Sequence, residues 1–317
     1  MAYRLKPDES VAAGAKRIVR EQIDKAVDEI DDEKLDRHET VHQVRKRCKK
    51  VRAVLRLIRG SIDADTYKFE NTFYRDAARK LSHIRDTEAM IETFDELVEH
   101  YEDQIDPGAY DSVREELRRR QDAAVDEDAE LDKLLEAFRA KMVEGRDRVS
   151  TWSLDADGFP AIAGGIEKTY KRGIKALDGV HGDPSTEQYH EWRKRTKYHW
   201  YHTRMLRDAW KEVMQARRDE LSDLSDLLGD EHDLGVFREM IEADAEAFGE
   251  STSVQAFVGL LDRRRSELRA EANALGGRIY AEAPKDHVSR LKVYWRHAVA
   301  EAEQAKELAE AKLPAGA

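Results

Sequence analysis

Histidine, arginine and lysine recur at helical spacing between Arg37 and Arg59, and two kinds of chemistry fit these residues. The segment begins with RHETVH, which contains the HExxH form of a zinc protease: two histidines hold the metal and the glutamate activates water. The remainder is a dense block of positive charge, because the segment carries nine Arg or Lys against one acid, Glu39. Such a block repels a metal cation but attracts an extended anion.

Most of these basic residues fall on one face of a helix. They follow one another at intervals of three or four residues, which on an α-helix forms one longitudinal stripe. Arginine offers a planar fork to phosphate oxygens, lysine a mobile charge, and histidine a donor whose charge depends on pH. The members of this first stripe are His42, Arg45, Lys49, Arg52, Arg56 and Arg59, and Lys46 lies beside them.

The same stripe occurs a second time, again with histidine at its start. An offset of 148 residues places 39–59 over 187–207, and an offset of 147 places LSHIRD (81–86) over LGDEHD (228–233). Two similar blocks in the same order indicate an internal duplication. We therefore expect two repeats, 1–150 and 159–317, within one domain that spans 1–317. The second stripe comprises His190, Arg193, Lys197, Trp200, Arg204 and Arg207, with Lys194 beside it.

The repeat weakens the zinc interpretation. Where the first copy reads HETVH the second reads TEQYH (186–190), so His38 has no counterpart while His42 does. Glu39 and Glu187 fit instead the first turn of a helix, where an acid complements the helix dipole. Asp86 and Asp233 are expected to cap the helices that follow them, with orientation of basic side chains as the alternative.

Helices must position these stripes. Apolar residues recur at three- and four-residue spacing almost throughout, and alternating strand patterns are scarce, so we predict an all-α fold. In both stripe helices, the residues that immediately precede the stripe members are expected to form the face that packs in the core. The stretch 153–165, with glycines and a proline, is the expected linker between the two halves. Helices are predicted over about 8–31, 38–60, 65–84, 87–105, 108–148, 165–179, 185–210, 212–229, 234–247, 252–281 and 284–312.

Composition narrows the classes of function. The single cysteine, Cys48, excludes an internal disulfide and a cysteine-built metal site within one chain, which fits a reducing, cytoplasmic setting. No apolar run approaches the roughly 20 residues needed to cross a bilayer, so we expect a soluble protein without membrane contact. The net charge of −11 opposes nonspecific binding to nucleic acids and anionic membranes, while the positive potential stays local to the stripes.

Further basic residues precede each stripe and are expected to extend its surface. The clusters 118–120 and 263–265 also align between the copies, but their consecutive placement points around the helix, so a solvated surface explains them equally well. The upstream residues are Lys16, Arg17 and Arg20 before the first stripe, and Lys168, Lys171 and Arg172 before the second.

These motifs resemble the CHAD family, the conserved histidine α-helical domain. The resemblance rests on HxxRxxxKxxR from His42, HxxRxxxK from His190, and the two blocks at 81–86 and 228–233, and it covers nearly the whole chain. It implies two tandem four-helix bundles related by a pseudo-twofold axis, with a basic channel or groove that binds inorganic polyphosphate, and association with polyphosphate granules. It also implies that the phosphate contacts are His42, Arg45, Lys49, Arg52, His190, Arg193 and Lys197, assisted by the upstream basic residues.

Two positions depart from the family pattern, and three hypotheses follow. Trp200 stands where many relatives have a basic residue, and Ser82 where they have glycine. We expect a polyphosphate-binding protein that is not an enzyme and needs no cofactor, because the ExExK signature of the triphosphatase domain attached in many relatives is absent from this sequence. One alternative is a nucleic-acid binder that stacks bases on Trp192, Tyr198, Trp200 and Tyr201. The other is a metal-dependent phosphohydrolase that uses HETVH or the His232-Asp233 pair.

Overall fold

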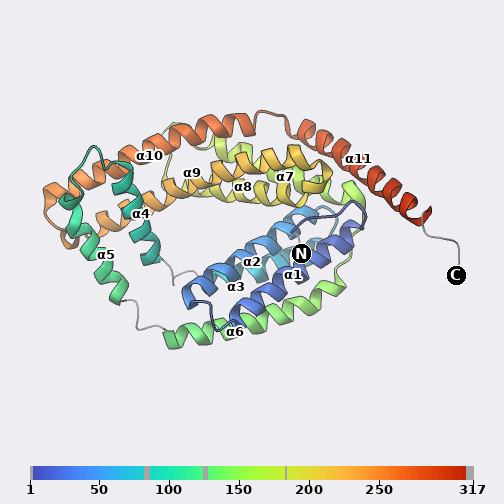
Figure 1. Cartoon of the computed structure of the whole chain (residues 1–317), viewed down its shortest axis with the longest axis horizontal. Helices are drawn as coiled ribbons and strands as arrows, with labels where there is room; N and C mark the ends of the chain where they lie inside the picture. Colours follow the sequence, from blue (N-terminus) through green and yellow to red (C-terminus); the bar gives the residue numbers. More distant parts are fainter. Residues whose placement is uncertain (1–2, 82–85, 124–127, 183, 312–317) are drawn as a thin grey trace.

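The described residues form an all-α protein, as predicted. The computed structural model describes residues 3–81, 86–123, 128–182 and 184–311 (Figure 1). Its only β-type pairing in these ranges is the isolated bridge between Ile62 and Leu154. The helices are α1 (Val11–Asp31), α2 (Arg37–Ile58), α3 (Ala64–Arg79), α4 (Asp86–His100), α5 (Asp111–Ala123), α6 (Asp128–Arg148), α7 (Gly158–Asp178), α8 (Thr186–Met205), α9 (Lys211–Ala243), α10 (Ser251–Ile279) and α11 (Pro284–Ala311).

The helices that carry the stripes begin where the sequence indicates. Asp36 caps α2, and its carboxylate accepts hydrogen bonds from the backbone N–H of His38 at 2.8 Å and of Glu39 at 3.3 Å. Ser185 caps α8 in a capping box with Gln188. Glu39 and Glu187 lie in the first turns of these helices, as predicted.

Several of the predicted boundaries are wrong. The two helices predicted over 212–229 and 234–247 are one continuous helix, α9, which ends at Ala243. Of the predicted helix 108–148, residues 111–123 form α5 and 128–148 form α6, and residues 124–127 lie outside the described part. The expected linker 153–165 is helical from Gly158 onward, as the beginning of α7. Glycine inside a helix usually signals a break, but here tertiary packing requires small residues within the helices.

Gly165 shows this requirement most directly. A Cβ atom built on Gly165 would lie 1.9 Å from the carbonyl oxygen of Leu57, so the backbones of α7 and α2 are in contact. Gly60, just beyond α2, lies beside Gly164 in the same way, with 3.7 Å between the position of a Gly60 Cβ and the Gly164 Cα. The end of the first stripe is thus held against the beginning of the second half of the chain.

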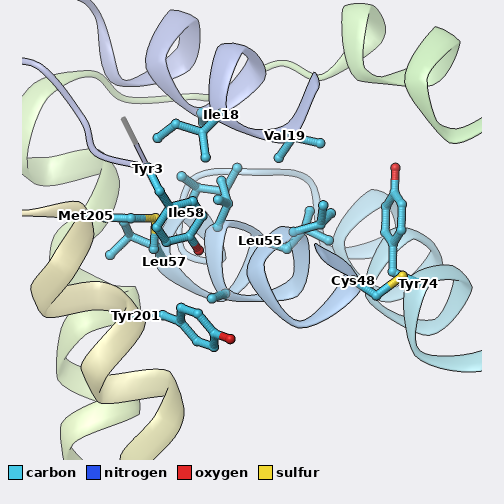
Figure 2. Close-up of a cluster of buried hydrophobic side chains, with 14 of the residues drawn as sticks. Tyr3, Ile18, Val19, Cys48, Leu55, Leu57, Ile58, Tyr74, Tyr201 and Met205 are labelled. Carbon is cyan, nitrogen blue, oxygen red and sulfur yellow. The ribbon is translucent and has the colours of Figure 1, made fainter. Parts of the chain in front are cut away.

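The buried side chains form three clusters, and each of the two larger ones contains residues of both halves of the sequence. The largest cluster joins α1, α2, α3 and α6 to α7, the end of α8 and α11. Figure 2 shows part of it, with Ile18 of α1, Leu55 of α2, Tyr74 of α3 and Met205 of α8. The second cluster joins α4 and α5 to α9 and α10, at one end of the molecule (Figure 1). The third joins α7, α8, α9 and α10.

The arrangement of two tandem, pseudo-symmetric four-helix bundles stays a prediction, as does the division into repeats at 150 and 159. The predicted core face of each stripe helix is buried: Val41, Val44, Cys48, Val51, Leu55 and Ile58 in α2, and Tyr189, Trp192, Thr196, His199 and Thr203 in α8 with Leu206 just beyond it. Within the described ranges, no helix has the length and apolar character required to cross a membrane.

The crossing of α2 and α7 generates the first prediction. Gly165→Ala places a methyl group against the Leu57 carbonyl, so we expect the free energy of unfolding to fall by about 1–3 kcal/mol or more. Gly164→Ala is the matched control, because its Cβ would meet the nearest atom, the Gly60 Cα, at an ordinary 3.9 Å. Because alanine has a higher helix propensity than glycine, Gly164→Ala should raise the free energy of unfolding by roughly 0.5–1 kcal/mol. Urea denaturation measures both variants, and equal losses would show that the close approach is unimportant.

Candidate functional site

The fold brings the two predicted stripes together. Helices α2 and α8 pack against each other, and the imidazole Nε2 of His202 lies 3.1 Å from the carbonyl oxygen of Ala53. The guanidinium of Arg56 lies over the ring of Tyr198, 4.2 Å from its centroid. Basic side chains from segments almost 150 residues apart in the sequence therefore share one surface. We call it the basic track, made of Arg45, Lys46, Lys49, Arg52 and Arg56 from α2 and Arg193, Lys197 and Arg204 from α8.

Lys49 lies near the centre of the basic track. Surrounding protein atoms lower its pKa to about 8, and Arg45, Arg193, Lys197 and Arg52 contribute in the same direction. The side chain is nevertheless exposed, so solvent reaches an ammonium group that cations from both helices surround. No carboxylate within the described part of the chain forms an ion pair with it.

Basic residues of α7 extend the track past the end of α2. Arg59 lowers the pKa of Lys168, and burial lowers the pKa of Arg172 with contributions from Arg195 and Arg56. These shifts place the α7 cations close to those of the two stripe helices. Of the predicted upstream residues, Lys168 and Arg172 therefore adjoin the track.

Three of the other upstream basic residues bond to groups of the protein, and the fourth, Arg20, is exposed to solvent. Arg17 bonds to the carboxylates of Glu9 and Glu21, and Lys171 pairs with Glu167 at 2.6 Å. Lys16 donates to the carbonyl of Ser150, whereas the side chain of Arg20 is exposed to solvent. Lys194, beside the second stripe, pairs with Glu187 at 3.3 Å and Glu191 at 3.0 Å.

Aromatic rings support several cations of the track. Lys197 and Arg204 lie on the ring of Trp200, at 5.5 and 5.4 Å from its centroid, so this departure from the family pattern positions two stripe cations. Two of the rings suggested for base stacking are in the core, since Trp192 is 0% and Tyr201 5% exposed. That part of the nucleic-acid hypothesis is wrong.

The block LGDEHD of α9 faces the second stripe. A Cβ built on Gly229 would lie 3.0 Å from a guanidinium nitrogen of Arg193, so glycine leaves room for this arginine. Asp233 Oδ1 lies 3.8 Å from Arg193 Nη1. Asp233 is inside α9, so the prediction that it caps a helix is wrong, and the alternative, a contact that orients a basic side chain, agrees with the structure. The equivalent residues 82–85 lie outside the described part, and so does the side chain of Asp86.

The surroundings of His190 differ from those expected for a positively charged phosphate contact. Its ring lies 4.1 Å from that of His232, centroid to centroid, and its Nδ1 is buried without a hydrogen-bond partner among the described residues. Burial, followed by the neighbouring His232, lowers the pKa of His190 to about 4. The imidazole is therefore neutral at pH 7 and offers a hydrogen bond rather than a charge, unless an anion nearby raises its pKa.

Sequence reasoning missed the most buried acid of this region. Glu231 is 0% exposed, and one of its oxygens accepts hydrogen bonds from Arg265 at 2.9 Å and from Arg269 at 2.8 Å. Arg265 also donates to the hydroxyl of Thr186, the first residue of α8, at 3.1 Å. Arg265 is thus buried and structural, in contrast to the solvated surface that its cluster suggested. In the sequence, the feature that could have indicated this role is the position of Glu231 between Asp230 and His232 in the repeated block LGDEHD.

Within the described part of the chain, the track coincides with neither a metal centre nor the cavity between α4, α9 and α10. The described ranges contain no group of three or more His, Cys, Asp or Glu residues placed to hold a metal ion. A cavity of about 110 Å³ lies between α4, α9 and α10, and its lining includes Glu96, Asp230 and Asp233. Burial and neighbouring carboxylates raise the pKa of Asp230 to about 6, so this cavity is unsuited to an anion.

The buried Lys50 generates a prediction about pH. Burial, followed by Arg47 and Arg204, lowers its pKa from 10.5 to about 7. Above pH 7 the folded protein therefore binds fewer protons at Lys50 than the unfolded chain, so this lysine makes stability rise with pH. We expect the free energy of unfolding of Lys50→Met to rise less between pH 7 and 9 than that of the unaltered protein. Lys175→Met, at an exposed position of α7, is the control; parallel slopes in all three proteins would contradict this assignment.

The ion pairs of Glu231 generate a prediction about the stability of the fold. Glu231→Gln keeps the shape but removes the nearest counter-charge of the buried guanidinium of Arg265, which then keeps only Asp262, at 3.8 Å. We therefore expect a loss of about 3 kcal/mol in the free energy of unfolding. Glu267→Gln is the control, because this acid pairs with Arg263 and Arg264 at the surface. A loss of about 1 kcal/mol or less is expected there. Thermal denaturation of the two variants checks the difference.

Comparisons with known proteins agree with the motifs and the fold. Among solved structures, the chain is similar to PptA from Streptomyces chartreusis, with 12% identity and a TM-score of 0.55, over 86% of this chain and 99% of that chain. No curated protein sequence matched the chain. A family model described as the CHAD domain matches residues 17–242. The chain therefore belongs to the CHAD domain family.

Proposed function

We propose that this protein binds inorganic polyphosphate along the basic track and holds it without cutting it. The observation that carries the proposal is the neighbourhood of Lys49, where cations from α2 and α8 meet around an exposed ammonium group. Like charges at such close range raise the free energy of the ligand-free protein. A bound polyanion removes this cost, because each phosphate interacts with several cations at once.

The shape of the track favours an extended ligand. From Arg45 to Arg59 the first stripe rises along about 20 Å of helix, at about 1.5 Å per residue. A chain of linked phosphates carries charge at every unit and can follow such a row. Buried donors are also available, since Arg56 Nε and His190 Nδ1 have no hydrogen-bond partner among the described residues. Membership of the CHAD family supports the same ligand.

The alternatives receive less support. For nucleic acid, Tyr198 and Trp200 remain as possible stacking platforms, but cationic side chains of the protein already lie on both rings. For hydrolysis, no observation favours a metal-bound nucleophile. We therefore propose a binding protein, not an enzyme, and we extend the proposal to polyphosphate granules in the cytoplasm, where long chains would be available.

A titration with polyphosphate of defined length tests the proposal. We expect affinity to fall as the salt concentration rises, since cations are released from the polymer. Replacement of His42, Arg45, His190 and Arg193 by alanine should lower affinity at least about tenfold, because hydrogen bonds to charged groups are lost. The matched control replaces two histidines and two arginines at exposed positions away from the track: His181, His297, Arg119 and Arg263.

Three outcomes would contradict the proposal in whole or in part. Equal affinity of the altered and control proteins would mean that the track is not the binding surface. Displacement of polyphosphate by RNA at equal phosphate concentration would favour the nucleic-acid hypothesis instead. Phosphate release from polyphosphate in the presence of Mg²⁺, Mn²⁺ or Zn²⁺ would overturn the non-catalytic part of the proposal.

A further inference from the structure

Two lysines that the repeat makes equivalent have different surroundings. Lys49 and Lys197 correspond at the offset of 148 residues, and both belong to the basic track. The Nζ atom of Lys197 lies 3.6 Å from Oδ1 of Asp226, on α9. Lys49 has no such carboxylate within the part of the chain that the structure describes. The two halves of the track are therefore unequal in the ligand-free protein.

The difference originates in the helix that packs beside each stripe. At the offset of 147 residues, Asp226 corresponds to Arg79, the last residue of α3, so the sign of the charge is reversed between the copies. Helix α9 packs along α8 and carries aspartates at intervals of four and three residues. Asp226 and Asp233 of this row approach Lys197 and Arg193 respectively. The row also includes Asp219, Asp223 and Asp230.

The geometry of the Asp226–Lys197 ion pair suits an acid that competes with a ligand for Lys197 better than one that holds Lys197 rigidly in place. A separation of 3.6 Å is longer than a strong charge-assisted hydrogen bond, and the side chain of Asp226 is 65% exposed. Exposed ion pairs of this kind are weak and open readily. An arriving phosphate can therefore replace the carboxylate of Asp226 at the ammonium group of Lys197 with little movement of either helix.

We propose that Asp226 competes with the bound anion for Lys197 and thereby makes the α8 half of the basic track the weaker half. This inference rests on the proposed function and deepens it. Affinity is then determined partly by an ion pair inside the protein that the ligand must break. The α2 half, where no carboxylate of the described residues pairs with Lys49, is the main anchor for the polymer.

The first experiment compares two variants with the same change in net charge. Asp226→Asn removes the competitor, whereas Asp223→Asn removes a charge from the same helix at an exposed residue that forms no ion pair within the described ranges. Titration with polyphosphate at pH 7 should show about a two- to five-fold gain in affinity for Asp226→Asn. The gain for Asp223→Asn should be smaller, because only the long-range field changes.

A double-mutant cycle separates competition of Asp226 for Lys197 from the long-range electrostatic effect of removing one negative charge. In a Lys197→Met background, Asp226→Asn should increase affinity no more than Asp223→Asn does, because the contested cation is absent. Lys49→Met should weaken binding more than Lys197→Met in the unaltered protein, and the two losses should become similar when Asp226 is replaced by asparagine.

Each other outcome is decisive. Weaker binding by Asp226→Asn would show that Asp226 positions Lys197 for the ligand, and equal gains for Asp226→Asn and Asp223→Asn would show a field effect alone; either result overturns the competition. Binding by the unaltered protein without a gain in Asp226→Asn overturns only this inference. Failure of the unaltered protein to bind polyphosphate overturns the proposed function as well.

Discussion

Repulsion between like charges on α2 and α8 is the constraint that the rest of the structure must satisfy. Lys49, Arg45 and Arg193 gather where the two helices meet, and the lowered pKa of Lys49 expresses the cost of bringing them together. Burial of the inward faces overcomes this cost: the face of α2 is apolar throughout, and that of α8 is partly aromatic and includes Thr196, His199 and Thr203. The contact of His202 with Ala53 holds these two helices at short range, and direct backbone contact at Gly165 holds α7 against α2.

Acidic residues are distributed so that they stabilise the fold without filling the track. Glu231 is buried and holds α10 and, through Arg265, the beginning of α8. Asp233 and Asp226 stay at the edge of the second stripe, where their contacts of 3.8 and 3.6 Å moderate its charge. The excess of acids in the whole chain, with a net charge of −11, therefore coexists with a local surface of opposite sign.

Histidines and aromatic rings give the track properties that charge alone lacks. His190 is held neutral by burial and by His232, so it can offer an anion a hydrogen bond and can gain a proton when negative charge arrives. Trp200 and Tyr198 lie beneath arginine and lysine side chains and limit their freedom. Side chains that are ordered before the ligand arrives lose less entropy on binding.

The sequence by itself determined the all-α fold, the beginnings of α2 and α8, and both basic stripes, because helical periodicity and capping are local properties of the chain. It could not show that α9 continues through Gly229 and Gly235, or that α7 begins within the expected linker. Glycine suits these helical positions because of tertiary contacts, with Arg193 at Gly229, Thr186 at Gly235 and Leu57 at Gly165. For Asp233 the sequence left two roles open, and the role of Glu231 was not predicted. Only the tertiary structure decided which acids meet which cations, because those partners lie on different helices and local sequence carries no record of them.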